Sequence, residues 1–212
     1  MNKLKVIQLL PELNIGGVER GTKDFSKALV KNGHESIVIS NGGIFEEDII
    51  KNGGKHIKLP IHKKSIFSLL LSKKLRSIYD QEKPDIVHVR SRMPAWINYH
   101  AFKGLTKKPI LISTFHGLYS TPLYSRVMSK VDHMIAISET VKKYIIDTYQ
   151  VNEKNITTIS RGCDTKHFNK TELNQDWINE WFNEYPETKD KIIITLPTRV
   201  SAWKGIDYFL EL

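Results

Sequence analysis

Short apolar runs alternate with helical patterns along most of the chain. Each run is rich in Ile and Val and bounded by Gly, Pro, Asn or Lys, which is typical of strands buried on both faces. The predicted strands cover residues 4–10, 35–40, 56–59, 85–89, 110–114, 132–137 and 156–160. The predicted helices between them cover residues 17–32, 45–52, 65–82, 94–106, 120–130 and 138–149. This alternation predicts an α/β fold with a doubly wound parallel sheet and right-handed crossovers.

The pattern changes near residue 165. The next stretch is polar with several aromatic residues, ends at Pro186, and predicts one short amphipathic helix. An apolar run then returns at 191–196 and predicts the first strand of a second sheet. One strand cannot bury its own faces, so this end needs further sequence or another chain to become ordered. The predicted organisation is a Rossmann-like domain over 1–165, an interdomain connection over 166–190, and the first strand and helix start of a truncated Rossmann-like domain over 191–212.

Composition narrows the function classes. The 212 residues carry a net charge of +9, which favours anionic partners or serves solubility alone. No zinc-finger spacing and no aromatic RNA-binding strand is present, so no nucleic-acid partner is expected. Cys163 is the only cysteine, which excludes a disulfide framework and fits a reducing compartment. The sequence shows no secretory signal and no apolar stretch of roughly 20 residues, so the expected location is the cytoplasm.

Two glycines follow the first predicted strand and open the first helix. Gly16 and Gly17 would let backbone N–H groups approach a ligand, and the start of a helix favours negative charge. The loop matches neither G-x-G-x-x-G nor a P-loop, and Ser40 stands where a dinucleotide fold wants an acidic residue. A generic dinucleotide or ATP site is therefore disfavoured. The alternative is that the glycines only make a tight turn.

A second loop near the end of the sequence also suits an anion. Residues 191–196 lead into a loop that carries Arg199 and Lys204, and a helix start follows. A bidentate guanidinium and a mobile ammonium at the head of a helix are suited to a diphosphate. The alternative is that both side chains lie in a solvated turn.

Four segments together resemble glycosyltransferase family 4, a family of retaining enzymes with two Rossmann-like domains in the GT-B arrangement. They are Gly16-Gly17-Val18-Glu19-Arg20, Lys83-Pro84-Asp85-Ile86-Val87-His88, Ser160-Arg161-Gly162-Cys163-Asp164 with Phe168, and Arg199 with Lys204-Gly205. The resemblance implies that the N-terminal domain binds the acceptor and the C-terminal domain binds most of the nucleotide-sugar. It implies neither a metal nor an organic cofactor.

The resemblance also assigns roles to residues. The backbone at Gly16 and Gly17 would approach the donor diphosphate or the transferring sugar. Arg199 and Lys204 would neutralise the leaving diphosphate, whose charge grows in the transition state. His116 ends a predicted strand, where open α/β sheets bind ligands. It is the expected catalytic residue, and a purely structural role is its alternative.

The acceptor side is expected after the fourth predicted strand. The family often has His-x-His there, whereas this chain has His88-Val89-Arg90. His88 is therefore a weaker candidate, and Arg90 and Arg92 would face an anionic acceptor such as a phosphorylated sugar. The resemblance gives Asp164 a role as an anchor of the interdomain hinge.

The expected function is transfer of a sugar from a UDP-, GDP- or ADP-sugar to a surface-glycan or lipopolysaccharide-type acceptor, either a glycan or lipid-linked. The family places a Glu-x7-Glu pair beyond Leu212, so we expect a truncated transferase that does not turn over alone. Two alternatives stay open, a non-catalytic acceptor-binding module and a half-enzyme completed by another chain.

Residues 63–76 combine lysines with an apolar helical stripe. Phe67, Leu71, Leu75 and Ile78 share one face of the predicted helix. Basic amphipathic helices lie on anionic bilayers, which predicts peripheral contact with the inner face of the cytoplasmic membrane. The alternative is that the stripe packs on the sheet and the lysines face water.

Overall fold

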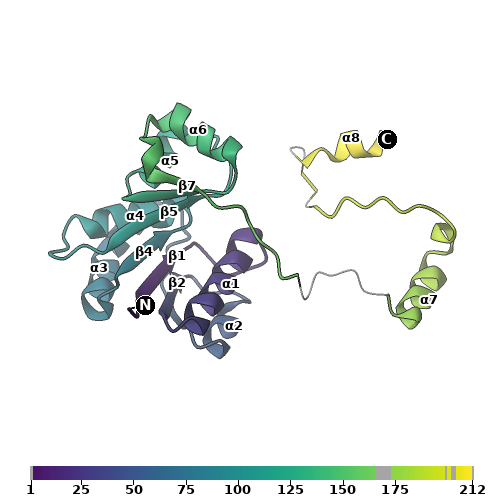
Figure 1. Cartoon of the computed structure of the whole chain (residues 1–212), viewed down its shortest axis with the longest axis horizontal. Helices are drawn as coiled ribbons and strands as arrows, with labels where there is room; N and C mark the ends of the chain where they lie inside the picture. Colours follow the sequence, from purple (N-terminus) through teal and green to yellow (C-terminus); the bar gives the residue numbers. More distant parts are fainter. Residues whose placement is uncertain (1, 166–172, 199, 202–203, 212) are drawn as a thin grey trace. The chain divides into compact units, whose positions relative to one another are not determined.

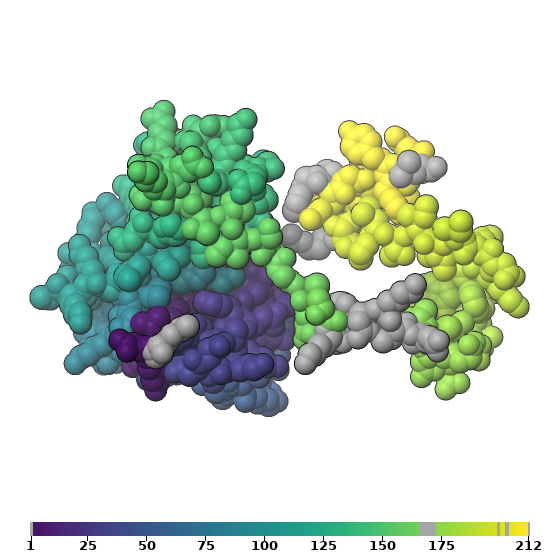
Figure 2. Space-filling model, in the orientation of Figure 1, coloured from purple at the N-terminus to yellow at the C-terminus, as the bar shows by residue number. Residues whose placement is uncertain are grey.

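The structure is a computed structural model that describes residues 2–165, 173–198, 200–201 and 204–211. The chain divides into two units, Met1–Gly162 and Cys163–Leu212, and each is described by itself. The first unit contains the sheet and the helices that cover it (Figure 1). In the space-filling view its atoms form one closely packed body, coloured purple to green (Figure 2).

One parallel sheet of seven strands organises the first unit, and it runs in the order β3-β2-β1-β4-β5-β6-β7. The strands are β1 (Lys5–Leu9), β2 (Glu35–Ser40), β3 (Lys55–Lys58), β4 (Ile86–Val89), β5 (Ile110–Phe115), β6 (His133–Ala136) and β7 (Ile156–Thr158). The predicted α/β fold with a doubly wound parallel sheet is confirmed. Every strand predicted within this unit is present, because apolar runs buried on both faces have few other conformations open to them.

Helices fill the predicted gaps between the strands. The longer ones are α1 (Gly17–Lys31), α2 (Glu46–Lys51), α3 (Leu71–Glu82), α4 (Arg92–Phe102) and α6 (Glu139–Tyr149); shorter turns are η1 (Ile66–Leu70), α5 (Pro122–Ser125), η2 (Arg126–Ser129) and η3 (Glu153–Asn155). Two differences from the prediction stand out. The helix expected over 120–130 is a short α-turn followed by a 3₁₀ turn, and α4 begins at Arg92 because Pro94 is tolerated within a first turn.

The two faces of the sheet differ in chemistry. Figure 1 shows α3 and α4 on one side and α1 and α2 on the other. The α3–α4 side is an apolar core that includes Ile7, Leu75 and Ile97. The α1 side is largely polar, since Gln8 donates to the Thr22 carbonyl at 3.3 Å and the Ser26 and Ser36 hydroxyls lie 2.8 Å apart. A second apolar cluster on this side is small.

The stripe at 63–76 is divided between the core and the surface. In α3, Leu75 and Ile78 are buried against the sheet, as the packing alternative expected. In η1, which Ser65 caps, Phe67 and Leu70 are 76% and 69% exposed. Within the described part of the chain, no helix is long and apolar enough to cross a membrane.

The second unit contains α7 (Gln175–Glu184), η4 (Pro186–Thr188) and α8 (Ile206–Leu210). The predicted amphipathic helix is therefore present, and the Trp177 and Trp181 rings stack at 5.7 Å. The predicted strand is absent among the described residues of 191–196, where Ile192 is 93% exposed. The physical reason is that an isolated strand has no neighbour to accept its backbone hydrogen bonds. The assignment of this end to a second Rossmann-like domain stays a prediction.

Candidate functional site

The candidate site lies along the carboxyl edge of the sheet. β1 has β2 on one side and β4 on the other, so the strand order reverses there, and ligands of open α/β sheets bind at such a switch point. Four segments that follow strands at this edge contain the site residues. Gly16 and Gly17 follow β1, Arg90 follows β4, His116 follows β5, and Arg161 follows β7.

The glycine loop leaves space for two side chains. A Cβ on Gly17 would overlap the Arg161 guanidinium, and a Cβ on Gly16 would overlap the Glu19 carboxylate. Both side chains therefore approach the loop closely. The start of α1 therefore has a cation from the segment after β7 and a carboxylate from its own first turn beside it.

His116 is held as a neutral imidazole. Its Nδ1 lies 2.9 Å from Nη2 of Arg161, while its Nε2 is buried and has no hydrogen-bond partner among the described residues. Burial, together with the charges of Arg90 and Arg161, lowers the pKa of His116 to about 3. The ring therefore stays uncharged near neutral pH and has one nitrogen available to a ligand.

His88 is buried inside the sheet on β4. Its Nε2 lies 2.7 Å from the Thr114 hydroxyl, and the Phe25 ring meets the imidazole edge-on at 6.1 Å. Burial, and then the charge of Arg90, hold the pKa of His88 well below its usual value. The structure thus places His88 behind the site edge, with its Nε2 already occupied.

Arg90 is a buried cation. Its Nη1 donates to Gln8 Oε1 at 3.0 Å, and its Nε has no partner among the described residues. Burial and the neighbouring Arg161 lower the pKa of Arg90 to about 10, and Glu19 acts in the opposite direction. Arg90 therefore remains charged at neutral pH, and with Arg161 it makes this edge attractive to an anion.

Arg92 contacts two aromatic rings. Its guanidinium stacks over the Tyr119 ring at 5.0 Å and the Tyr124 ring at 5.4 Å. It also donates to Thr121 Oγ1 at 2.8 Å. Arg90 and Arg92 therefore have different side-chain partners, and their expected contact with an anionic acceptor stays a prediction.

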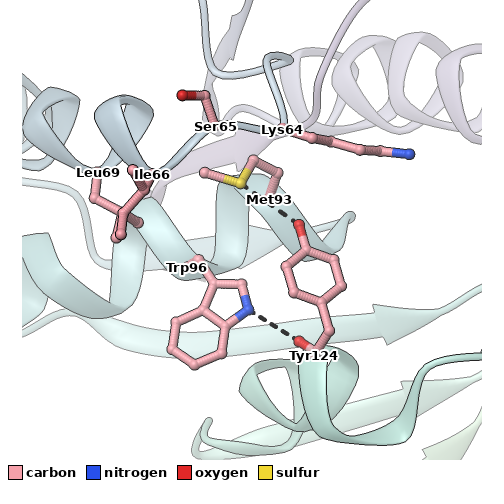
Figure 3. Close-up of a pocket in the computed structure, with 7 residues that line it drawn as sticks. All are labelled: Lys64, Ser65, Ile66, Leu69, Met93, Trp96 and Tyr124. Carbon is pink, nitrogen blue, oxygen red and sulfur yellow. Dashed lines mark hydrogen bonds between the residues drawn. The ribbon is translucent and has the colours of Figure 1, made fainter.

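An apolar pocket of about 260 Å³ is lined in part by Tyr124, one of the two rings that Arg92 contacts (Figure 3). Its polar groups are largely paired with each other. Trp96 Nε1 donates to the Tyr124 carbonyl at 2.9 Å, and the Tyr124 hydroxyl contacts Met93 Sδ at 3.5 Å. The pocket is lined by Lys64, Ser65, Ile66, Leu69, Met93, Trp96 and Tyr124. It suits an apolar group better than a polar one.

Comparison with known proteins identifies the family. Residues 15–167 match the model of Glycosyltransferase Family 4. The chain belongs to Glycosyltransferase Family 4. This agrees with the resemblance seen in the sequence, and the matched range contains Gly16, Gly17, Arg90, His116 and Arg161.

Three similar proteins show how much of a longer chain this family 4 chain matches. A crystal structure of a glycosyltransferase from Rickettsia africae is 34% identical, with a TM-score of 0.80 over 97% of this chain and 55% of that one. Anabaena HepE, solved in complex with UDP and glucose, is 15% identical with a TM-score of 0.77 over 98% of this chain and 57% of that one. An uncharacterized glycosyltransferase of Methanocaldococcus jannaschii is 25% identical and is matched by 100% of this chain over 59% of its own length. The family 4 chain thus spans little more than half the length of these relatives.

The structure gives no distance between the residues expected to bind the donor and the site at the edge of the sheet. Arg199 lies outside the described residues. Lys204 belongs to the second unit, just before α8. No group of His, Cys, Asp and Glu that could hold a metal ion occurs in the parts of the chain that the structure describes.

Sequence reasoning missed Arg161, Glu19, Gln8 and the aromatic pocket as parts of this site. Arg161 belongs to one of the four resembling segments, yet no role was predicted for it. Its strand, β7, is at the far edge of the sheet from β1. Only the path of the chain after β7 brings Arg161 over Gly17. The glycine was the one available signal, since it marks a place where something approaches the backbone closely.

Proposed function

We propose that this chain is the acceptor-side part of a retaining GT-B glycosyltransferase, which transfers a sugar from a nucleotide-sugar to a glycan or lipid-linked acceptor of a surface glycan or lipopolysaccharide. The carrying observation is the cluster at this edge, where neutral His116 is hydrogen-bonded to Arg161, Arg90 adds a second positive charge, and the glycine start of α1 lies against Arg161. Such a site supplies fixed positive charge and one hydrogen-bonding imidazole in a largely buried place.

The donor is proposed to be a UDP-, GDP- or ADP-sugar. As the bond from the anomeric carbon to the diphosphate breaks, negative charge grows on the leaving group, and preorganised cations stabilise it. Arg199 and Lys204 would bind that diphosphate. The backbone of Gly16 and Gly17 would lie close to the diphosphate or to the transferring sugar. The similar fold of HepE, solved with UDP and glucose, supports a nucleotide-sugar as donor.

The acceptor is proposed to bring an apolar chain beside Arg92. The pocket of Trp96 and Tyr124 has few polar atoms left to bind, so an alkyl or isoprenoid segment fits its chemistry. Next to it in the chain, exposed Phe67 and Leu70 are flanked by lysines. This combination supports contact with the anionic inner face of the cytoplasmic membrane.

The test of transfer is nucleoside diphosphate release from a panel of UDP-, GDP- and ADP-sugars, with a membrane-glycan extract as acceptor. It is run on the 212-residue chain and on a joined enzyme, in which this chain is followed by the part of the Rickettsia africae glycosyltransferase that it does not match. Acceptor-dependent release by the joined enzyme is the expected result. Release by neither protein, both being folded, would favour the non-catalytic binding module. Activity of the chain only when a separate polypeptide is added would favour the half-enzyme.

Membrane contact is tested by sedimentation with phosphatidylglycerol vesicles. Phe67→Glu is expected to lower the bound fraction several-fold, because it places a carboxylate in the exposed apolar segment. Ile44→Glu is the matched control, since Ile44 is 59% exposed elsewhere on the same unit. Equal binding by both variants would remove this segment from the membrane proposal.

A further inference from the structure

We propose that Arg161 is a positioning residue that fixes His116 in the tautomer carrying its proton on Nε2, and that position 17 is a glycine to leave room for that guanidinium. Neither role was predicted from the sequence. No function was predicted there for Arg161, and Gly17 was explained by the close approach of a ligand to the backbone.

The hydrogen bond between the two side chains determines the tautomer. Arg161 Nη2 lies 2.9 Å from His116 Nδ1. A guanidinium has only N–H donors and stays protonated in proteins, so Nδ1 must be the acceptor. With a proton on Nδ1, the Arg161 N–H and the His116 N–H would point at each other and no hydrogen bond would form. The single proton of the neutral ring is therefore on Nε2.

The surroundings also keep the ring neutral. Arg90 and Arg161 are the charged groups that act on it, and both disfavour an imidazolium, as burial does. Protonation would add a third positive charge to this edge. The ring accepts at one nitrogen and donates at the other, and Arg161 decides which nitrogen does which.

The Nε2–H group is left available for a ligand. The atom is buried and has no hydrogen-bond partner among the residues that the structure describes. A buried donor without an acceptor has lost its hydration without gaining a hydrogen bond, so this atom favours occupation by an acceptor oxygen. Resting on the proposed function, we assign it to an oxygen of the bound sugar or acceptor, to which His116 donates. In this role His116 positions or polarises and does not take a proton.

Gly17 is explained by the same contact. The described glycines with positive φ are Gly33, Gly42, Gly43, Gly53 and Gly205, so the backbone at Gly17 is open to other residues. A Cβ there would nevertheless overlap Nη1 of Arg161. The side chain that occupies this space belongs to the protein itself, and an added methyl group would push the guanidinium away from His116.

The test is the ¹⁵N spectrum of the His116 ring in the 212-residue chain, because the two nitrogen shifts report which atom carries the proton. We expect the Nε2–H form in the unaltered protein. Arg161→Met, which keeps the length and removes the donors, should convert it to a mixture of tautomers, and Arg161→Lys should restore part of the Nε2–H population. Arg126→Met is the matched control at an exposed arginine of η2, and the His88 signals report that the fold is intact.

Gly17→Ala should shift the His116 signals in the same direction as Arg161→Met. Gly21→Ala is its control on the same helix, where a Cβ would make only an ordinary contact with Arg90. An Nδ1–H form in the unaltered protein, or an unchanged tautomer in Arg161→Met, would overturn the positioning role. An unchanged spectrum in Gly17→Ala would overturn the explanation of the glycine. These readouts need no donor or acceptor, so absence of sugar transfer would defeat the proposed function and leave the tautomer assignment standing.

Discussion

A histidine in the interior of the sheet and a histidine at its carboxyl edge differ in their hydrogen bonds. His88, in the interior, has its Nε2 paired with Thr114 at 2.7 Å and its ring against Phe25. His116, at the edge, is paired only at Nδ1, and its buried Nε2 has no partner among the described residues. His88 is buried and His116 is partly buried, and burial is the largest cause of the lowered pKa of each.

The two histidines differ in whether the Nε2 atom already has a hydrogen-bond partner among the described residues. Buried polar atoms are nearly always paired, so an unpaired one has a cost that the fold must offset elsewhere. In the interior the protein has avoided that cost with a hydroxyl from the neighbouring strand. At the edge, where ligands of this fold class bind, the cost remains. Burial and a lowered pKa do not tell the two apart, whereas the state of the second nitrogen does.

The largest expected effect is on transfer by the joined enzyme. His116→Asn removes the Nε2–H donor at the edge, and loss of one preorganised donor lowers kcat by about 10²–10³-fold. The measurement is nucleoside diphosphate release at saturating donor. His133→Asn is the control, because His133 pairs with Thr157 away from this cluster and should leave kcat within about two-fold. A kcat unchanged by His116→Asn would place His116 with His88 as a structural residue.

The next effect is on stability in acid. The folded pKa of His116, about 3, is below its usual value of 6.5, so the unfolded chain binds the proton first and stability falls as pH drops below 6.5. One such group contributes about 1.4 kcal/mol per pH unit, so the unaltered protein should lose about 2 kcal/mol more than His116→Asn between pH 7 and pH 5. Urea unfolding at the two pH values measures this. Equal losses in both proteins would show that His116 is protonated normally in the folded state.

The interior histidine is tested through its hydroxyl partner. Thr114→Val keeps the shape of the side chain and leaves Nε2 of His88 buried without a partner, which should lower the free energy of unfolding by roughly 1–2 kcal/mol. Thr140→Val, at an exposed position of α6, should change it by less than about 0.5 kcal/mol. If the two variants are equally stable, the pairing of His88 has no energetic weight, and the contrast with His116 loses its basis.

The smallest effect concerns the aromatic contact. Phe25→Leu removes the edge-on ring from His88 and keeps an apolar side chain, which should reduce the free energy of unfolding by about 0.5–1.5 kcal/mol. Because no aromatic ring among the described residues packs on His116 in this way, the ¹⁵N signals of His116 should stay unchanged while those of His88 move. Movement of the His116 signals instead would mean that the interior and the edge are coupled.

Part of the site was predictable from the sequence, and part was not. Gly16, Gly17, Arg90 and His116 each follow a strand of a parallel sheet, so strand order alone brings them to one edge. Arg161 was not predictable as their partner, because it depends on how the chain turns after β7. The apolar stripe at 63–76 also needed the fold, since a helical period does not tell which turns face the sheet and which face solvent.

The sequence by itself determined the α/β class and the strands of the first unit, because buried strands and amphipathic helices have a local hydrophobic period. It also determined the family, through four resembling segments. The tertiary structure decided which atoms are paired. It joined Arg161 to His116 across 45 positions, gave His88 a hydroxyl partner, and placed Arg92 over two tyrosine rings. Hydrogen bonds between distant residues depend on distances of a few tenths of an ångström, and no local pattern carries that information.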